Sequence, residues 1–232
     1  MKRLFLENRP AILTVSLALV LAIGWFTIPK IIITAVQTNN AIKKNYPAIK
    51  LPQDIREKIE KDVRDVTMAI KTGDKRGSAN FSNDYISLGV DFETLGLFGF
   101  AEDAYRRAIK EDPANYVGYA NLGGLHQTRS EYSSAIAELR NAIERAPTQE
   151  GLYVRLSELY WYRLGDLDSA RGIYLEGIMR TNNNDGLVRS FASFLEQTNQ
   201  KQEAIEYFDA LVKRNPGDQE LKKHLDGLKG SK

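Results

Sequence analysis

The sequence has no cysteine and only two histidines among its 232 residues. The absence of cysteine excludes disulfide bonds, zinc or iron–sulfur sites held by thiolates, and catalysis by a thiol. An excess of one charge is also missing, because 32 lysine and arginine residues are balanced by 30 aspartate and glutamate residues. The formal charge of +2 gives no field over the whole molecule that would attract nucleic acid.

What the sequence does contain is a long apolar run near its N-terminus. Residues 11–28 carry no charge and include ten Ile, Leu, Val or Phe residues. As a helix this run would extend about 27 Å, close to the roughly 30 Å of a bilayer core. We therefore expect a transmembrane helix within residues 11–36. Because Lys2, Arg3 and Arg9 precede the run, we expect residues 1–10 to be a cytoplasmic tail. A cleaved signal peptide is the alternative.

Two further segments precede the second half of the chain. Residues 37–52 are polar and contain two prolines, which predicts a linker. Residues 53–72 carry one apolar stripe on a charged helix: Ile55, Ile59, Val63, Val66 and Ile70. We expect this helix to pack on the unit that follows it, and a dimerising coiled coil or a helix on a membrane surface are the alternatives. A loop is expected from Gly73 to Ser82.

Small residues and prolines then recur at a fixed interval. Four alanines are spaced by 34, 35 and 34 residues: Ala101, Ala135, Ala170 and Ala204. Three of them are followed 12 residues later by a proline: Pro113, Pro147 and Pro216. A period of this size indicates one supersecondary unit copied in series, whose neighbours bury each other's apolar faces. We place the one extra residue of the third unit in the turn near Leu164.

The residues between these markers have a helical period. The first unit has the markers Tyr85, Leu88, Gly89, Phe92, Gly96, Phe98, Ala101, Tyr105, Ala108 and Pro113. The second has Tyr119, Leu122, Gly123, Tyr132, Ala135, Leu139, Ala142 and Pro147. This pattern resembles the tetratricopeptide repeat, in which each unit is an antiparallel pair of helices. The third and fourth units match it more loosely, because Gly177 and Asn182 replace an alanine and a proline, and Val188 replaces the first aromatic residue.

The resemblance implies an all-α fold, a tetratricopeptide-like solenoid of helical hairpins, here with an N-terminal transmembrane helix. Four repeats and a C-terminal capping helix would occupy residues 82–229, after an amphipathic helix and loop at 53–81. Replacing Gly123 with Leu should overpack the contact between the two helices of its pair by roughly 1–3 kcal/mol.

Residues able to do chemistry are scarce. His126 stands where the repeat carries a packing aromatic residue, so we expect it in the core, and His224 has no neighbouring nucleophile to activate. The glycine-containing stretches lack the lysine of a phosphate-binding loop, and the asparagines at 182–184 do not have the spacing of an EF-hand. We expect no enzyme, no catalytic residue, no cofactor and no metal site.

The remaining candidate is a binding surface. In the family, the first helices of the pairs line a groove that commonly holds an extended peptide. Helical phase places six candidate residues off the packing stripe: Asn121, Gln127, Arg155, Trp161, Tyr162 and Arg189. Val90 and Glu196 share this phase. Trp161 is expected either to anchor a partner or to pack on the next repeat. A carboxylate clamp of the kind found in one subtype is doubtful, because Ile86, Val90 and Gly151 occupy clamp positions.

The leading hypothesis is a single-pass membrane scaffold that binds a protein or peptide partner, with its repeats on the extracytoplasmic side. The alternative is an assembly subunit of an envelope secretion or pilus-type machine that acts through oligomerisation. We expect no nucleic-acid partner, and the sequence leaves the oligomeric state open.

Overall fold

The computed structural model describes residues 53–54, 57–58, 61, 64–65 and 78–230. The predicted transmembrane segment and linker lie outside these residues. Within the described ranges, no helix is both long enough and apolar enough to cross a bilayer. The chain divides into two compact units, Met1–Lys75 and Arg76–Lys232.

Only the polar positions of the predicted amphipathic helix are described in the first unit. Residues 53–54, 57–58, 61 and 64–65 are helical and exposed. The side chain of Gln53 donates a hydrogen bond to Glu57 over 2.8 Å, one helical turn away. The apolar stripe lies outside the described residues, so its packing stays a prediction.

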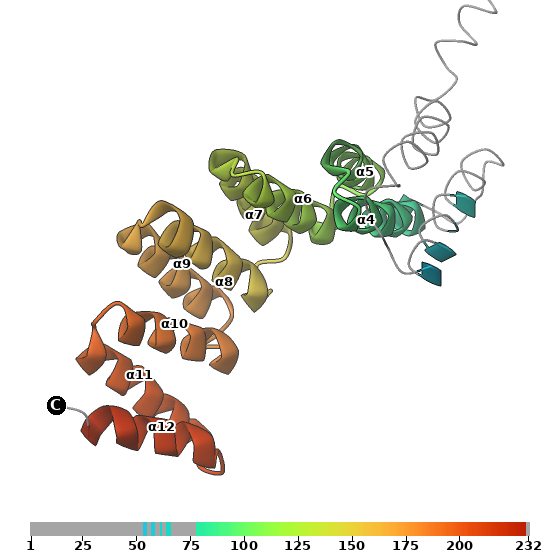
Figure 1. Ribbon diagram of the computed structural model, residues 1–232. Helices are drawn as coiled ribbons and strands as arrows, with labels where there is room; N and C mark the ends of the chain where they lie inside the picture. Colours follow the sequence, from blue (N-terminus) through green and yellow to red (C-terminus); the bar gives the residue numbers. More distant parts are fainter. Residues whose placement is uncertain (1–52, 55–56, 59–60, 62–63, 66–77, 231–232) are drawn as a thin grey trace, which may run out of the picture. The chain divides into compact units, whose positions relative to one another are not determined.

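The second unit is a succession of helices, and the described residues contain no strand (Figure 1). In chain order the helices are α4 Ser78–Thr94, α5 Phe98–Glu111, α6 Tyr116–Thr128, α7 Tyr132–Arg145, α8 Glu150–Glu158, the π-helix η2 Leu159–Leu164, α9 Leu167–Arg180, α10 Asp185–Gln197, α11 Lys201–Arg214 and α12 Gln219–Gly230. The predicted all-helical, tetratricopeptide-like solenoid is confirmed for this unit. One boundary differs, since α4 begins at Ser78 inside the segment that we expected to be a loop.

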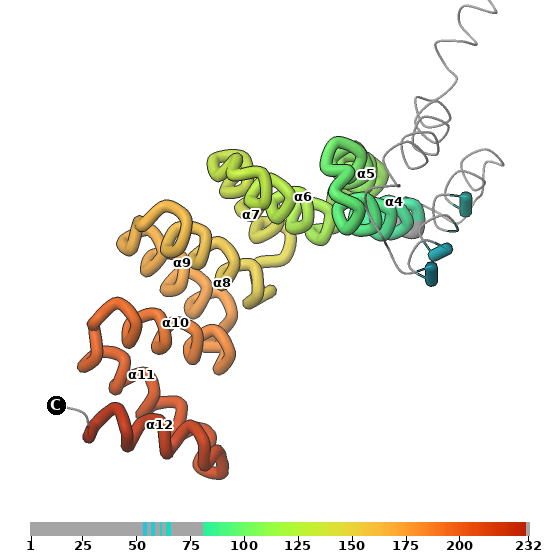
Figure 2. The backbone as a smooth tube through the Cα atoms, in the orientation of Figure 1, coloured from blue at the N-terminus to red at the C-terminus, as the bar shows by residue number. Residues whose placement is uncertain are grey.

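The helices pack as four hairpins followed by a single helix. The tube in Figure 2 shows α4 with α5, α6 with α7, α8 with α9 and α10 with α11, and each hairpin contacts the next along the chain. Helix α12 packs on α11. Its Leu221, Leu225 and Leu228 are buried, and the role of this helix as a cap of the last repeat stays a prediction.

The turn inside each hairpin has the same backbone conformation. One residue per turn has a left-handed φ between 61° and 69°: Gly96, Ser130, Gly165 and Asn199. Glycine adopts this conformation without strain, whereas serine and asparagine pay a small cost. The repeated turn fixes where the second helix of each pair begins.

The spaced alanines are fully buried in their hairpins. Ala101, Ala135, Ala170 and Ala204 are each 0% exposed. A large buried residue follows each alanine by four positions: Tyr105, Leu139, Tyr174 and Phe208. A Cβ added to Gly89 would overlap the ring of Tyr105. Small residues on one helix therefore make room for large residues on the other.

Helix α9 offers a direct test of this packing. A Cβ at Gly177 would lie 2.6 Å from Cγ of Tyr153 and 2.7 Å from Cδ2 of Leu187, whereas a Cβ at Gly172 would meet nothing within 4 Å. We expect Gly177→Ala to lower the free energy of unfolding by about 1–3 kcal/mol. Gly172→Ala should raise it by about 0.5–1 kcal/mol, because alanine favours the helix. Urea denaturation followed by far-ultraviolet circular dichroism measures both, and equal effects would contradict the packing argument.

Candidate functional site

The six candidate residues all lie on first helices of the hairpins. Asn121 and Gln127 are on α6, Arg155 is on α8, Trp161 and Tyr162 are on η2, and Arg189 is on α10. First helices of neighbouring pairs contact each other where α4 meets α6 and where α8 meets α10. The residues predicted from the sequence therefore all lie on the first helices of their hairpins.

The π-helix explains how the third repeat accommodates its extra residue. After each left-handed turn residue, the next backbone N–H donates to a carbonyl at the end of the first helix. This bond spans five residues in three hairpins: Leu97 to Phe92, Glu131 to His126 and Gln200 to Leu195. In the third hairpin it spans six, from Asp166 to Tyr160 over 3.0 Å. The extra residue thus lies inside the helix, and our prediction that it falls in the turn near Leu164 is wrong.

An aromatic stack forms on this π-helix. The rings of Trp161 and Tyr162 are nearly parallel, with 4.0 Å between their centroids and 21° between their planes. Trp161 also meets the buried ring of Phe194 on α10 edge-on, at 5.1 Å. Trp161 therefore packs on the next repeat, whereas Tyr162 remains 58% exposed. The ring that is most accessible to a partner belongs to Tyr162.

Arg155 extends from α8 to the backbone of α6. A Cβ added at Gly124 would lie 2.6 Å from Nη2 of Arg155, so the guanidinium fits only because position 124 is a glycine. Burial lowers the pKa of Arg155, and the carboxylates of Glu93 and Glu158 oppose that shift. Arg155 makes no hydrogen bond or ion pair of 4 Å or less with another described residue.

Two residues of α10 are instead paired with the capping helix. Arg189 donates to Asp218, just before α12, over 2.9 Å. Glu196, which shares the phase of the candidates, lies 3.0 Å from Nε2 of His224 on α12. The ring of His224 also meets Phe208 edge-on at 4.9 Å. These pairs were not predicted from the sequence, and they occupy two of the charged side chains of α10.

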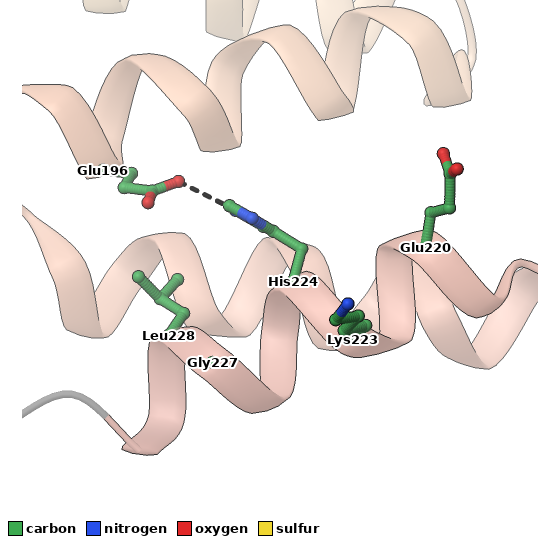
Figure 3. A pocket seen from close by; sticks show the side chains of 6 residues that line it. All are labelled: Glu196, Glu220, Lys223, His224, Gly227 and Leu228. Atoms are coloured by element: carbon green, nitrogen blue, oxygen red, sulfur yellow. Dashed lines mark hydrogen bonds and ion pairs between the residues drawn. The ribbon is translucent and has the colours of Figure 1, made fainter.

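A shallow hollow opens beside the pair between Glu196 and His224 (Figure 3). Glu196 comes from α10, and the other lining residues come from α12: Glu220, Lys223, His224, Gly227 and Leu228. Acidic and basic groups are mixed around it. It contains one of the residues with groove phase, Glu196, and none of the six main candidates.

His126 has a structural position. It is 5% exposed, as predicted for a core residue. Its Nδ1 lies 2.6 Å from Oε2 of Glu131, and Arg129 pairs with the other oxygen of that carboxylate over 2.8 Å. These contacts connect the end of α6 to the turn before α7. In the described part of the chain, no group of three or more metal-binding side chains comes together.

We call Asn121, Gln127, Arg155, Glu158, Trp161 and Tyr162 the first-helix surface. Glu158 is the member that the sequence analysis missed. It is exposed at the end of α8, three residues before Trp161. Partial desolvation, and then the carboxylate of Glu158, raise the pKa of Tyr162. Its helical spacing from Trp161 and Tyr162 was the available signal.

Comparison with known proteins agrees with this architecture. A family model described as Tetratricopeptide repeat matches residues 190–218. The crystal structure of MamA is 20% identical and superposes with a TM-score of 0.52, over 74% of this chain and 99% of that chain. A second crystal structure of the MamA protein is 19% identical, with a TM-score of 0.52 over 81% of this chain and 94% of that one. At these identities the likeness shows the fold.

Two curated proteins also match in part. Tetratricopeptide repeat protein 14 of Mus musculus is 27% identical over 94 residues, which are 40% of this chain and 12% of that protein. The Heat shock protein sti1 homolog of Schizosaccharomyces pombe is 28% identical over 118 residues, which are 51% of this chain and 18% of that protein. The chain thus matches less than a fifth of the length of either relative. The family model and the shared fold support a helical repeat protein of the tetratricopeptide type.

Asp218 gives a test of how the capping helix is held. It accepts a hydrogen bond from the backbone N–H of Leu221 over 2.9 Å. That bond, and then the one from Arg189, lower the pKa of Asp218. The carboxylate therefore stabilises the fold above the pKa of an unfolded aspartate, about 3.9, and this contribution is lost as the pH falls through the lower folded pKa.

We expect Asp218→Ala to increase amide hydrogen exchange in α12 several-fold at neutral pH, because the helix loses its N-cap. Asp218→Asn keeps a capping oxygen and should have a smaller effect. Exchange in α6 should be the same in both variants. Unchanged exchange in α12 of Asp218→Ala would contradict this role.

Proposed function

We propose that this protein is a membrane-anchored scaffold that binds a protein or peptide partner along the first-helix surface. The main support for the proposal is the environment of the Arg155 guanidinium. Its guanidinium is partly buried and has no ion-pair partner of 4 Å or less among the described residues. A desolvated cation gains most from an added acceptor, since its interactions with water are already reduced.

The charged residues of α10, in the next hairpin, differ from Arg155 in having partners. On α10, Arg189 and Glu196 are each paired with the segment that ends the chain. Among the described residues, no later helix pairs with the side chains of Asn121, Gln127 or Arg155 on α6 and α8. A partner chain would supply polar contacts at α6 and α8 comparable to those that the capping helix supplies at α10.

The exposed aromatic ring adds an anchor. Tyr162 presents an accessible face supported from behind by Trp161, which is itself held against Phe194. A rigid aromatic residue contributes contact area to an interface at a low cost in conformational entropy. Arg155 and Tyr162 lie seven residues apart along the same continuous helix, which suits an extended segment better than a compact ligand.

The membrane part of the proposal rests on the sequence of residues 1–36. Their basic start and uncharged apolar run support a single spanning helix with the repeats on the extracytoplasmic side. The assembly-subunit alternative has less support. The outer positions of α12 carry Lys222, Lys223, Asp226 and Lys229, all exposed, so this end of the array offers a polar surface for stacking.

Photocrosslinking tests the binding surface. We expect a benzoylphenylalanine residue in place of Gln127 to give discrete adducts with a partner in native membranes, and one in place of Gln202 on α11 to give none. Tyr162→Ala and Arg155→Ala should each reduce the yield at position 127 by about tenfold. Met179→Ala removes another exposed apolar side chain, 75% accessible, and should leave the yield unchanged. Equal adducts at 127 and 202 would refute the proposed surface.

Membrane fractionation tests the anchor. We expect the full chain to remain in the pellet after an alkaline carbonate wash, and a chain that starts at residue 37 to be released. Protease added to right-side-out vesicles should digest the repeats of the full chain. Extraction of the full chain by carbonate, with residues 1–36 shown to be present by mass spectrometry, would refute the anchor, and protection of the repeats would reverse the orientation.

A further inference from the structure

Three residues at the junction of α8 and η2 form one group. Glu158 is the last residue of α8, and Trp161 and Tyr162 follow it by three and four positions on η2. The carboxylate of Glu158 is close enough to Tyr162 to act on its hydroxyl group electrostatically. Glu158 is exposed, and Tyr162 is 58% exposed. The rings of Trp161 and Tyr162 stack at 4.0 Å. A carboxylate and an accessible ring therefore lie next to each other on the first-helix surface.

Glu158 differs from Glu93 and Glu196, two other carboxylates of the first helices. Glu93 accepts a hydrogen bond from the hydroxyl of Tyr105 over 2.9 Å. Glu196 is paired with His224. Glu158 forms no hydrogen bond or ion pair of 4 Å or less with another described residue. Arg155 stands one turn earlier and is close enough to Glu158 for charge attraction, while its Nη2 approaches the backbone at Gly124.

An accessible aromatic ring beside a carboxylate favours a positively charged ligand group. The face of an aromatic ring attracts a cation, and a neighbouring carboxylate adds direct charge attraction. An acidic group would be repelled by Glu158, and an apolar group would desolvate it without compensation. Two exposed leucines, Leu164 and Leu167, follow closely in the chain and suit the methylene stem of a long basic side chain.

We propose that Glu158 and the Trp161–Tyr162 stack bind a lysine or arginine side chain of the partner peptide. The proposal rests on the proposed function, since it names what the first-helix surface selects. The carboxylate pairs with the charged head, and the exposed ring of Tyr162 covers it from one side. Arg155, one turn earlier on α8, would bind an acidic or carbonyl group of the same peptide. The expected partner is therefore a segment that carries charges of both signs.

Trp161 is one of only two tryptophans, and the other is Trp25. In a Trp25→Phe chain, purified full-length in detergent, indole fluorescence reports on Trp161 alone. The probes are three capped peptides of equal length that carry Lys, Glu or Leu at alternate positions among Gly and Ser. We expect the Lys peptide to change the emission of Trp161 saturably and to bind about tenfold more tightly than the others.

Charge reversal supplies the matched comparison. Glu158→Lys should weaken binding of the Lys peptide by at least about tenfold and favour the Glu peptide. Glu144→Lys makes the same change at an exposed carboxylate on α7 and should leave both affinities unchanged. Circular dichroism confirms that the variants are folded. Equal losses in Glu158→Lys and Glu144→Lys would overturn the proposal, because binding would then follow net charge.

The remaining outcomes separate this inference from the proposed function. Tighter binding of the Glu or Leu peptide, or no response to the Lys peptide while adducts still form at position 127, overturns the basic-side-chain specificity and leaves peptide binding intact. No response to any peptide together with no adduct at position 127 overturns both.

Discussion

The closest approach of the two helices in each hairpin governs the rest of the structure. Each second helix has an alanine with no exposed surface and, four positions later, a large buried side chain, and the ring of Tyr105 lies against Gly89 of the partner helix. A single hairpin cannot bury both of its apolar faces, so it stays folded only when a neighbour covers it. Stability is therefore shared between adjacent pairs, and each end of the array needs a cover. At the C-terminal end α12 provides that cover through three buried leucines.

The capping helix also bears on the proposed binding surface. Asp218 and His224, from the segment that includes α12, pair with two charged residues of α10, Arg189 and Glu196. The groups without such a pairing lie on α6 and α8–η2, in the middle of the array. Surface ion pairs of this kind contribute little to stability, so under the proposed function their main effect is on which surface is left to meet a partner. In the proposed function, the first helices of the hairpins therefore serve both to pack the capping helix and to bind the partner.

The sequence predicted the hairpins well, because alanine, glycine and proline mark contacts that tolerate few other residues. It also identified His126 as a core residue, since a fixed period assigns each position its environment. It did not predict that Arg189 is paired with Asp218 or that Arg155 lies on Gly124. Those contacts join residues about thirty positions apart on different helices, and they depend on the angle between neighbouring hairpins. A repeat period carries no information about that angle.

The π-helix limits the effect of one additional residue. An insertion in a regular helix would turn every later side chain by about 100°, yet Tyr153 and Leu156 before it and Ala170 and Tyr174 after it are all buried. The bulge absorbs the rotation within a single turn, and Gly165 restores the usual hairpin geometry. The exposed residues of this turn are consequently free of the positional constraint that the period imposes elsewhere. A repeat array can in this way acquire an individual surface at one hairpin while its neighbours keep their shared frame.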